Sequence, residues 1–160
     1  MIITVQAERD IRALIDVVFA LTLDPDRFPA TFRGCGPIPA LRRITPNAPS
    51  AVGSTRQVES SDNSVLTERI VALDPPHRHA YVLSGLRPPL AWLAREGYAD
   101  WRFAPSPTGT LVTWRYDFTL TSPLAWPLAA PVLSGFMCAA MRRCLAAMAG
   151  LVEAPNPAGA

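Results

Sequence analysis

The chain contains no lysine: all 15 of its basic residues are arginine, and 13 acidic residues leave a net charge of +2 over 160 residues. Such a balanced charge, without a basic cluster along one face, is not typical of nucleic-acid-binding proteins, so we expect no nucleic-acid partner. The stretch Gly34-Cys35-Gly36 is not a phosphate-binding loop either, because it lacks the lysine, the strand and the helix of such a loop.

Cysteine and histidine are scarce. The three cysteines, Cys35, Cys138 and Cys144, are odd in number and have no zinc-site spacing, which predicts free thiols rather than disulfides. His77 and His79 form a His-x-His pair without supporting cysteines or carboxylates, and we interpret that pair as part of an ordinary turn. The sequence therefore predicts no metal site and no cofactor.

Long uncharged segments are also few. The N-terminal segment MIITVQAERDI lacks a basic region followed by a long apolar run, so we expect no secretory signal and a cytoplasmic protein. Residues 124–141 carry no charge, which raises the possibility of a transmembrane helix. Pro127, Pro131 and Gly135 interrupt that segment. We expect a break at Pro131, then a long, mostly buried helix over residues 132–151, and no stable membrane insertion.

Residues 110–122 alternate with a period of two. Val112, Trp114, Tyr116, Phe118 and Leu120 are apolar, and the residues between them are polar. This pattern predicts a strand with one solvated face. It leaves open whether the aromatic face packs into the core or lines a cavity.

The order of elements predicts an α+β fold in a single domain over residues 1–153, followed by a disordered tail at 154–160. We expect a strand over residues 1–11 and a helix over 11–23. Six further strands are expected near residues 40–45, 53–60, 64–73, 79–85, 96–104 and 110–120, before the terminal helix.

Several segments carry a family resemblance: VGSTRQV, TERIVALDPPHRHAY, YADWRFAPSPTGTLVTWRYDF and an apolar helix with a double arginine. Over residues 3–152 the chain resembles the START-like (SRPBCC) superfamily, and within it the polyketide cyclase/dehydrase and lipid-transport family. The resemblance implies a helix-grip fold, in which a curved antiparallel sheet of about seven strands surrounds the C-terminal helix and leaves an internal cavity. These motifs mark the fold rather than a reaction.

Strand pairing gives the residues that should face the cavity. If Trp114 faces inward, the preceding hairpin places Trp101 and Phe103 on the same side. The turn at residues 74–77 pairs Ile70 with Tyr81 and Glu68 with Leu83, so Glu68 should face inward too.

The turn at residues 61–64 extends this pairing to one more strand. Centring it between Asp62 and Asn63 pairs Gln57 with Glu68 and places Gln57 and Glu59 in the cavity. Arg56 and Arg69 then lie outside. A slip of one residue would exchange the two sets.

Two functions fit this prediction. The first is binding of a hydrophobic small molecule, such as a lipid, a sterol-like or a polyketide-like compound. The alternative is a cofactor-independent cyclase, aromatase or dehydratase that uses the same cavity, with Glu68 and Tyr81 as candidate catalytic groups. A protein-interaction or toxin-antitoxin module on the same fold is a third possibility, and a homodimer stays open. The candidate ligand-binding residues are Gln57, Glu59, Glu68, Tyr81, Trp101, Phe103, Trp114, Tyr116, Phe118, Met137 and Met141.

Overall fold

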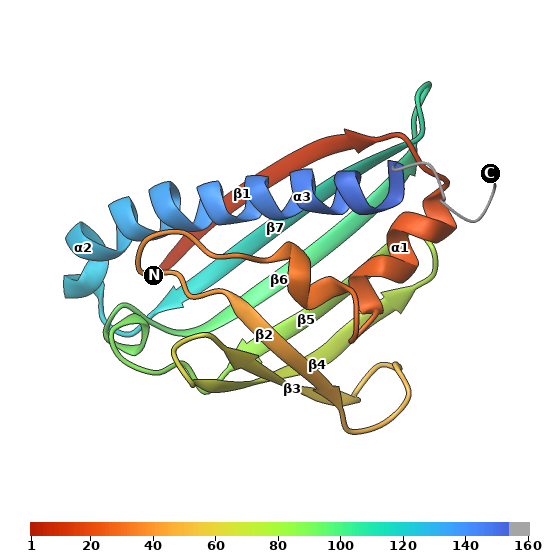
Figure 1. Ribbon diagram of the computed structural model, residues 1–160. Helices are drawn as coiled ribbons and strands as arrows, with labels where there is room; N and C mark the ends of the chain where they lie inside the picture. The colour runs from red at the N-terminus through yellow and green to blue at the C-terminus, as the bar shows by residue number, and fades with distance from the viewer. Residues whose placement is uncertain (154–160) are drawn as a thin grey trace.

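The computed structural model describes residues 1–153, in which a curved antiparallel sheet holds a long C-terminal helix on its concave side (Figure 1). The sheet has seven strands in the order β1-β7-β6-β5-β4-β3-β2. This confirms the predicted helix-grip fold. The strands are β1 (Ile2–Ile11), β2 (Leu41–Pro46), β3 (Thr55–Ser60), β4 (Val65–Asp74), β5 (Arg78–Ser84), β6 (Ala94–Pro105) and β7 (Thr110–Leu120).

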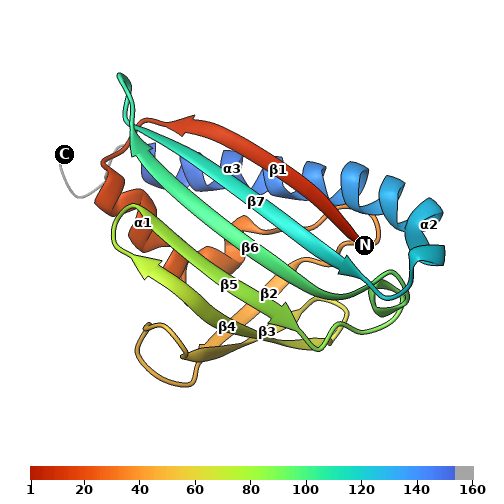
Figure 2. The same ribbon diagram turned by 180° about the vertical axis from the view of Figure 1, so that it is seen from behind.

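The hairpin β6–β7 forms the centre of the concave face. Trp101 pairs with Trp114 and Phe103 pairs with Val112, as the alternation predicts. All four side chains are buried. The back of the sheet, seen in Figure 2, carries the intervening polar residues of both strands.

The N-terminal helix is shorter than the sequence suggested. Strand β1 continues to Ile11, which pairs with Thr110 of β7, and helix α1 (Ile15–Leu23) begins only after a short bend. The prediction that the helix starts at residue 11 was therefore wrong. Pairing with β7 retains Ile11 in the sheet, where its side chain is fully buried. A short 3-10 helix, η1 (Phe28–Thr31), follows α1.

The C-terminal helix does not break at Pro131, contrary to our prediction. A continuous helical segment runs through η3 (Pro123–Ala125), α2 (Trp126–Pro131), the π-helical turn η4 (Val132–Met137) and α3 (Cys138–Glu153). A proline inside a helix removes one hydrogen bond and crowds the preceding turn. A wider π-helical turn follows directly after Pro131, and the helix continues through it into α3.

The two halves of this helical segment have different surroundings. By length and composition alone, residues 123–153 could cross a membrane, and 28% of the most apolar window is buried. Core helices of soluble proteins also meet that criterion. In α3, Met141, Cys144 and Met148 are fully buried, whereas Leu124 and Leu128 near the start of the segment are exposed. The predicted tail at 154–160 lies outside the described residues.

Candidate ligand-binding cavity

A cavity of about 100 Å³ lies between the concave face of the sheet and the helical layer. Its walls are mostly apolar. Side chains from strands β2 to β7 form one wall, and the η1 region, the segment before β6 and the π-helical turn form the other. Representative wall residues are Phe28, Phe32, Leu83, Leu90, Leu133 and Met137.

An ion pair stands at the polar side of the cavity. Glu68 of β4 lines the cavity, and its Oε2 accepts a hydrogen bond from Nε of Arg56 at 2.5 Å. Both side chains are buried. The prediction that Glu68 faces inward is confirmed, since Ile70 pairs with Tyr81 and Glu68 with Leu83 as expected.

The predicted register of β3 was wrong by one residue. Glu68 pairs with Arg56, and Thr67 pairs with Gln57. Gln57 and Glu59 therefore lie on the opposite face from Glu68, and neither lines the cavity. The cause is an odd-length loop: Asn63 adopts a left-handed conformation with φ of 65°, and Ser60 donates its backbone N–H to the Ser64 carbonyl.

Burial dominates the electrostatics of the pair. It raises the pKa of Glu68, and the neighbouring Arg56 guanidinium opposes that rise. Burial also works against the charge of Arg56, but Glu68 and two tyrosines outweigh it and raise the pKa of the guanidinium. Arg56 is therefore a permanent cation inside the fold, and Glu68 is the group that neutralises it.

Two tyrosines continue the polar side of the cavity. Tyr116 donates its hydroxyl proton to the Tyr81 hydroxyl oxygen at 3.2 Å, and the guanidinium carbon of Arg56 lies 5.6 Å from the centre of the Tyr81 ring. Burial, followed by the charge of Glu68, raises the pKa of Tyr81. Burial, followed by Tyr81, raises that of Tyr116. Both residues thus remain neutral phenols that can donate hydrogen bonds.

The two central tryptophans have different positions. Their rings stack with centres 4.0 Å apart, but only Trp114 lines the cavity, and Trp101 is buried outside the lining. Nε1 of Trp114 is buried and has no hydrogen-bond partner among the described residues. A buried donor without a partner is costly, and a ligand acceptor could satisfy it.

His79 lies in strand β5 and is fully enclosed, so interpreting it as a turn residue was wrong; His77 does lie in the turn. The Thr22 hydroxyl donates to the Phe19 carbonyl, so its oxygen must accept from Nε2 of His79, 2.8 Å away. Nδ1 of His79 is then an unprotonated nitrogen without a partner within residues 1–153. Burial, together with the charge of Arg56, lowers the pKa of His79 to about 3.

The predicted site residues thus fall into three groups. Those that line the cavity are Glu68, Tyr81, Trp114, Tyr116, Phe118 and Met137. Trp101, Phe103 and Met141 are buried but lie outside the lining, and Gln57 and Glu59 face away. A role in binding stays a prediction for all of them.

Sequence reasoning missed Arg56 and Ser60, which are buried on the inner face of β3. A usable signal was present. Val58 is the one large apolar residue of this strand, and because side chains two apart share a face, it places Arg56 and Ser60 beside it. Within residues 1–153 no cluster of three or more histidine, cysteine or carboxylate side chains is arranged to hold a metal ion.

Comparisons with known proteins identify the family and agree with the fold. A family model described as "Polyketide cyclase / dehydrase and lipid transport" matches residues 3–153. No protein of curated function matches the sequence.

Solved structures share the fold at low sequence identity. The Zhui aromatase/cyclase from Streptomyces sp. R1128 is 16% identical, with a TM-score of 0.76 and 99% of each chain covered. The di-domain aromatase/cyclase StfQ of the steffimycin biosynthetic pathway is 17% identical, with a TM-score of 0.73; 95% of this chain is covered, but the match spans only 51% of StfQ. Ara h 8.0201 is 13% identical, with a TM-score of 0.67 and coverages of 96% and 99%.

Proposed function

Because the chain belongs to the polyketide cyclase/dehydrase and lipid-transport family, we propose that it binds a hydrophobic small molecule in the internal cavity. The ligand is a lipid, a polyketide-like or a sterol-like compound, and the protein works in the cytoplasm. The observation that carries this proposal is the cavity itself, with largely apolar walls and a few polar groups gathered on one side. Sites for small organic ligands commonly have this composition.

The size of the cavity bears on how such a ligand enters. Its volume of about 100 Å³ is small, since ligand pockets usually begin at roughly 300 Å³. A ligand with several rings must therefore displace part of the wall. Phe32, Pro39, Leu86 and Leu90 line the cavity from segments outside the sheet. We expect these segments to move on binding while the strands stay in place.

The electrostatics favour a binding protein. At neutral pH a general base needs an accessible, unprotonated group that is free to take a proton. Glu68 is engaged by Arg56, and both tyrosines are neutral phenols. The cavity thus offers hydrogen-bond donors, which orient a ligand, rather than a free base.

The cyclase, aromatase or dehydratase alternative is supported by one observation. Glu68, Tyr81 and Tyr116 line the same cavity, close to the charge of Arg56. Such a group of donors could stabilise an enolate or a polarised carbonyl of a folded substrate. In that case Glu68→Gln should reduce turnover by roughly 100-fold while binding is largely retained.

Titration with a neutral apolar fluorophore, N-phenyl-1-naphthylamine, tests the binding proposal. We expect a one-site isotherm and displacement by long-chain or polycyclic compounds. Leu66→Phe adds bulk to the cavity wall and should weaken probe binding, whereas Val65→Phe, on the neighbouring exposed position of the same strand, should not. Equal binding by both variants, or no saturable binding to the wild type, would refute the proposal. Mass spectrometry of co-purifying compounds would then identify the natural ligand.

A further inference from the structure

Two surface turns share the same four residues, Pro-Leu-Ala-Trp, at positions 89–92 and 123–126. Both form 3-10 turns, η2 (Leu90–Trp92) and η3 (Pro123–Ala125). Each presents its tryptophan to solvent: Trp92 is 69% exposed and Trp126 is 50% exposed. Leu124 and Leu128 add to the exposed apolar surface, at 90% and 69%. We call Trp92, Leu124, Trp126 and Leu128 the apolar platform.

The two turns are neighbours in space. Thr121, just before the second turn, donates its backbone N–H to the Leu93 carbonyl at 3.0 Å and its hydroxyl to the Ala91 carbonyl at 2.8 Å. These bonds tie the second turn to the end of the first. Figures 1 and 2 show the segment before β6 and helix α2 at the same end of the molecule from both sides. The apolar platform is therefore a single surface formed by two segments of the chain.

The platform adjoins the cavity. Leu90 belongs to the first turn and lines the cavity, while Trp92, two residues later, faces solvent. Leu86 lines the cavity from the same segment, and Leu133 lines it from the helical turn that follows α2. Part of the wall that we expect to move for a larger ligand is thus the inner side of the segments that carry the platform.

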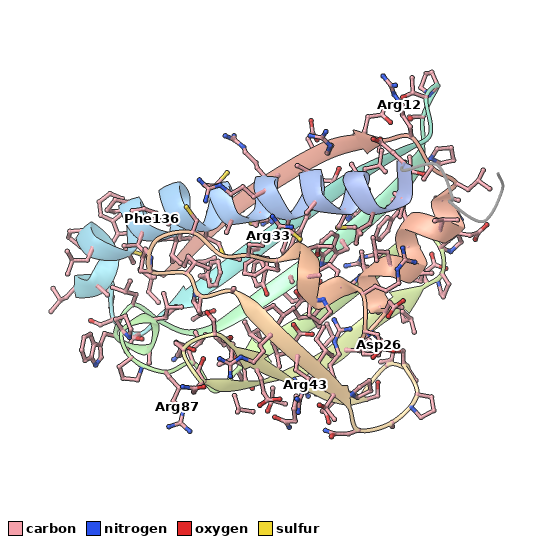
Figure 3. The ribbon with its side chains drawn as sticks, in the orientation of Figure 1. Arg12, Asp26, Arg33, Arg43, Arg87 and Phe136 are labelled. Carbon is pink, nitrogen blue, oxygen red and sulfur yellow. The ribbon has the colours of Figure 1, made fainter. Side chains whose placement is uncertain are left out.

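Most of the charges near the platform are positive. Residues 85–95 and 121–141 contain two charged side chains, Arg87 and Arg95, and the exposed acid Glu96 follows Arg95. Both arginines are exposed, and Figure 3 shows Arg87 pointing into solvent. Exposed tryptophan and leucine beside arginine suit the boundary between lipid headgroups and acyl chains, where aromatic rings are favoured and arginine contacts anionic headgroups.

We propose that the apolar platform docks this protein peripherally on an anionic phospholipid bilayer, so that an apolar ligand can pass between the lipid and the cavity. Docking is superficial because the helical segment is anchored from Met137 onward, where Met137, Met141 and Cys144 are buried in the core. The part before Met137, residues 123–136, is itself buried at Ala129 and Leu133 and is shorter than the roughly 20 residues needed to span a bilayer. The transfer step rests on the proposed ligand binding, but docking does not.

Vesicle flotation tests the docking. The full chain is mixed with vesicles of phosphatidylcholine, with or without phosphatidylserine, and we expect stronger binding to the anionic vesicles. The double variant Trp92→Ser/Trp126→Ser should weaken that binding by roughly tenfold or more, because it removes the two interfacial aromatic rings. The control Leu14→Ser/Val52→Ser removes two exposed apolar residues that lie outside the platform and should behave as the wild type.

A second pair of variants tests the charge contribution. Arg87→Gln/Arg95→Gln should lower affinity for anionic vesicles by about fivefold per arginine and leave binding to neutral vesicles unchanged. Absence of vesicle binding, or equal loss in the control, would overturn the proposal. It would also be overturned if the wild type formed dimers that the tryptophan variant abolished, since the platform would then bind a second copy.

The naphthylamine titration keeps the two proposals separate. The tryptophan variant should still bind the probe, because neither Trp92 nor Trp126 lines the cavity. Vesicle binding without probe binding would refute the proposed function alone. Probe binding without vesicle binding would refute the docking alone.

Discussion

Arg56 and Glu68 face each other across strands β3 and β4 and form a buried ion pair on the inner side of the sheet. Both side chains are more than nine-tenths buried, so each charge depends mainly on the other. Breaking a buried pair is far more costly than replacing both members, because the remaining charge is left uncompensated. This relationship determines how substitutions in the polar side of the cavity will behave.

The first prediction concerns this pair. Glu68→Leu or Arg56→Met alone should lower the free energy of unfolding by about 3–5 kcal/mol, whereas the double variant should lose clearly less than the sum. Urea denaturation of the four proteins measures the coupling. The exposed pair Arg43–Glu59, with nitrogen and oxygen 3.6 Å apart, is the control, and its coupling should not exceed about 1 kcal/mol.

The two single variants should differ in their pH dependence. Burial already raises the pKa of Glu68, so without Arg56 the carboxyl can bind a proton and avoid burying its charge. The cost of Arg56→Met should therefore shrink as the pH is lowered. Arg56 cannot lose its proton near neutral pH, so the cost of Glu68→Leu should show no such relief. Parallel pH profiles for the two variants would contradict this account.

The second prediction concerns His79. Its folded-state pKa of about 3 lies below the value near 6.5 expected for an unfolded chain. Between these values the unfolded state binds a proton that the folded state does not, so stability is lost as the pH falls from 6.5 toward 3. The slope should approach about 1.4 kcal/mol per pH unit. His79→Gln should remove this contribution between pH 5 and 6.5, and the exposed turn variant His77→Gln should retain it.

The third prediction concerns the unpartnered Nε1 of Trp114, which should donate a hydrogen bond to an oxygen of the ligand. Fluorenone carries a carbonyl that fluorene lacks. Trp114→Phe should weaken fluorenone binding by about fivefold and change fluorene binding much less, because a neutral hydrogen bond contributes about 1 kcal/mol. Trp101→Phe alters the stacked ring outside the cavity lining and serves as the control. Equal effects of Trp114→Phe on both compounds would exclude the hydrogen bond.

The fourth prediction concerns Gly97, which pairs with Phe118 in the sheet. A Cβ atom there would lie 3.0 Å from the Tyr116 ring and 3.1 Å from the Phe118 ring. Gly97→Ala should press both rings away from the strand toward the cavity, which lowers stability and weakens binding of the naphthylamine probe. Gly150→Ala, in α3, meets no atom within 4 Å. It should raise stability by about 0.5–1 kcal/mol through helix propensity and leave probe binding unchanged.

The sequence by itself determined the strands and most of their inward faces. Apolar and polar side chains alternate strictly from Val112 to Leu120. Only one orientation of this strand buries all the apolar side chains, because a shift of one residue would turn each of them to the solvated face. The same reasoning placed Glu68 inside. The turn between β4 and β5 pairs Ile70 with Tyr81 on the inner face, and Glu68, two residues before Ile70, shares that face. Local periodicity is sufficient where each strand has a consistently apolar face.

Only the tertiary structure decided the register of β3, the partner of Glu68 and the extent of the C-terminal helix. Asn63 adds one left-handed residue to the turn, and this local change exchanges Gln57 for Arg56 inside the fold. The helix continues through a π-helical turn after Pro131 instead of breaking there. Strand β3 carries polar residues on both faces, and Val58 is its one large apolar residue, so only Val58 indicates the inner face; the turn at Asn63 sets the pairing with β4.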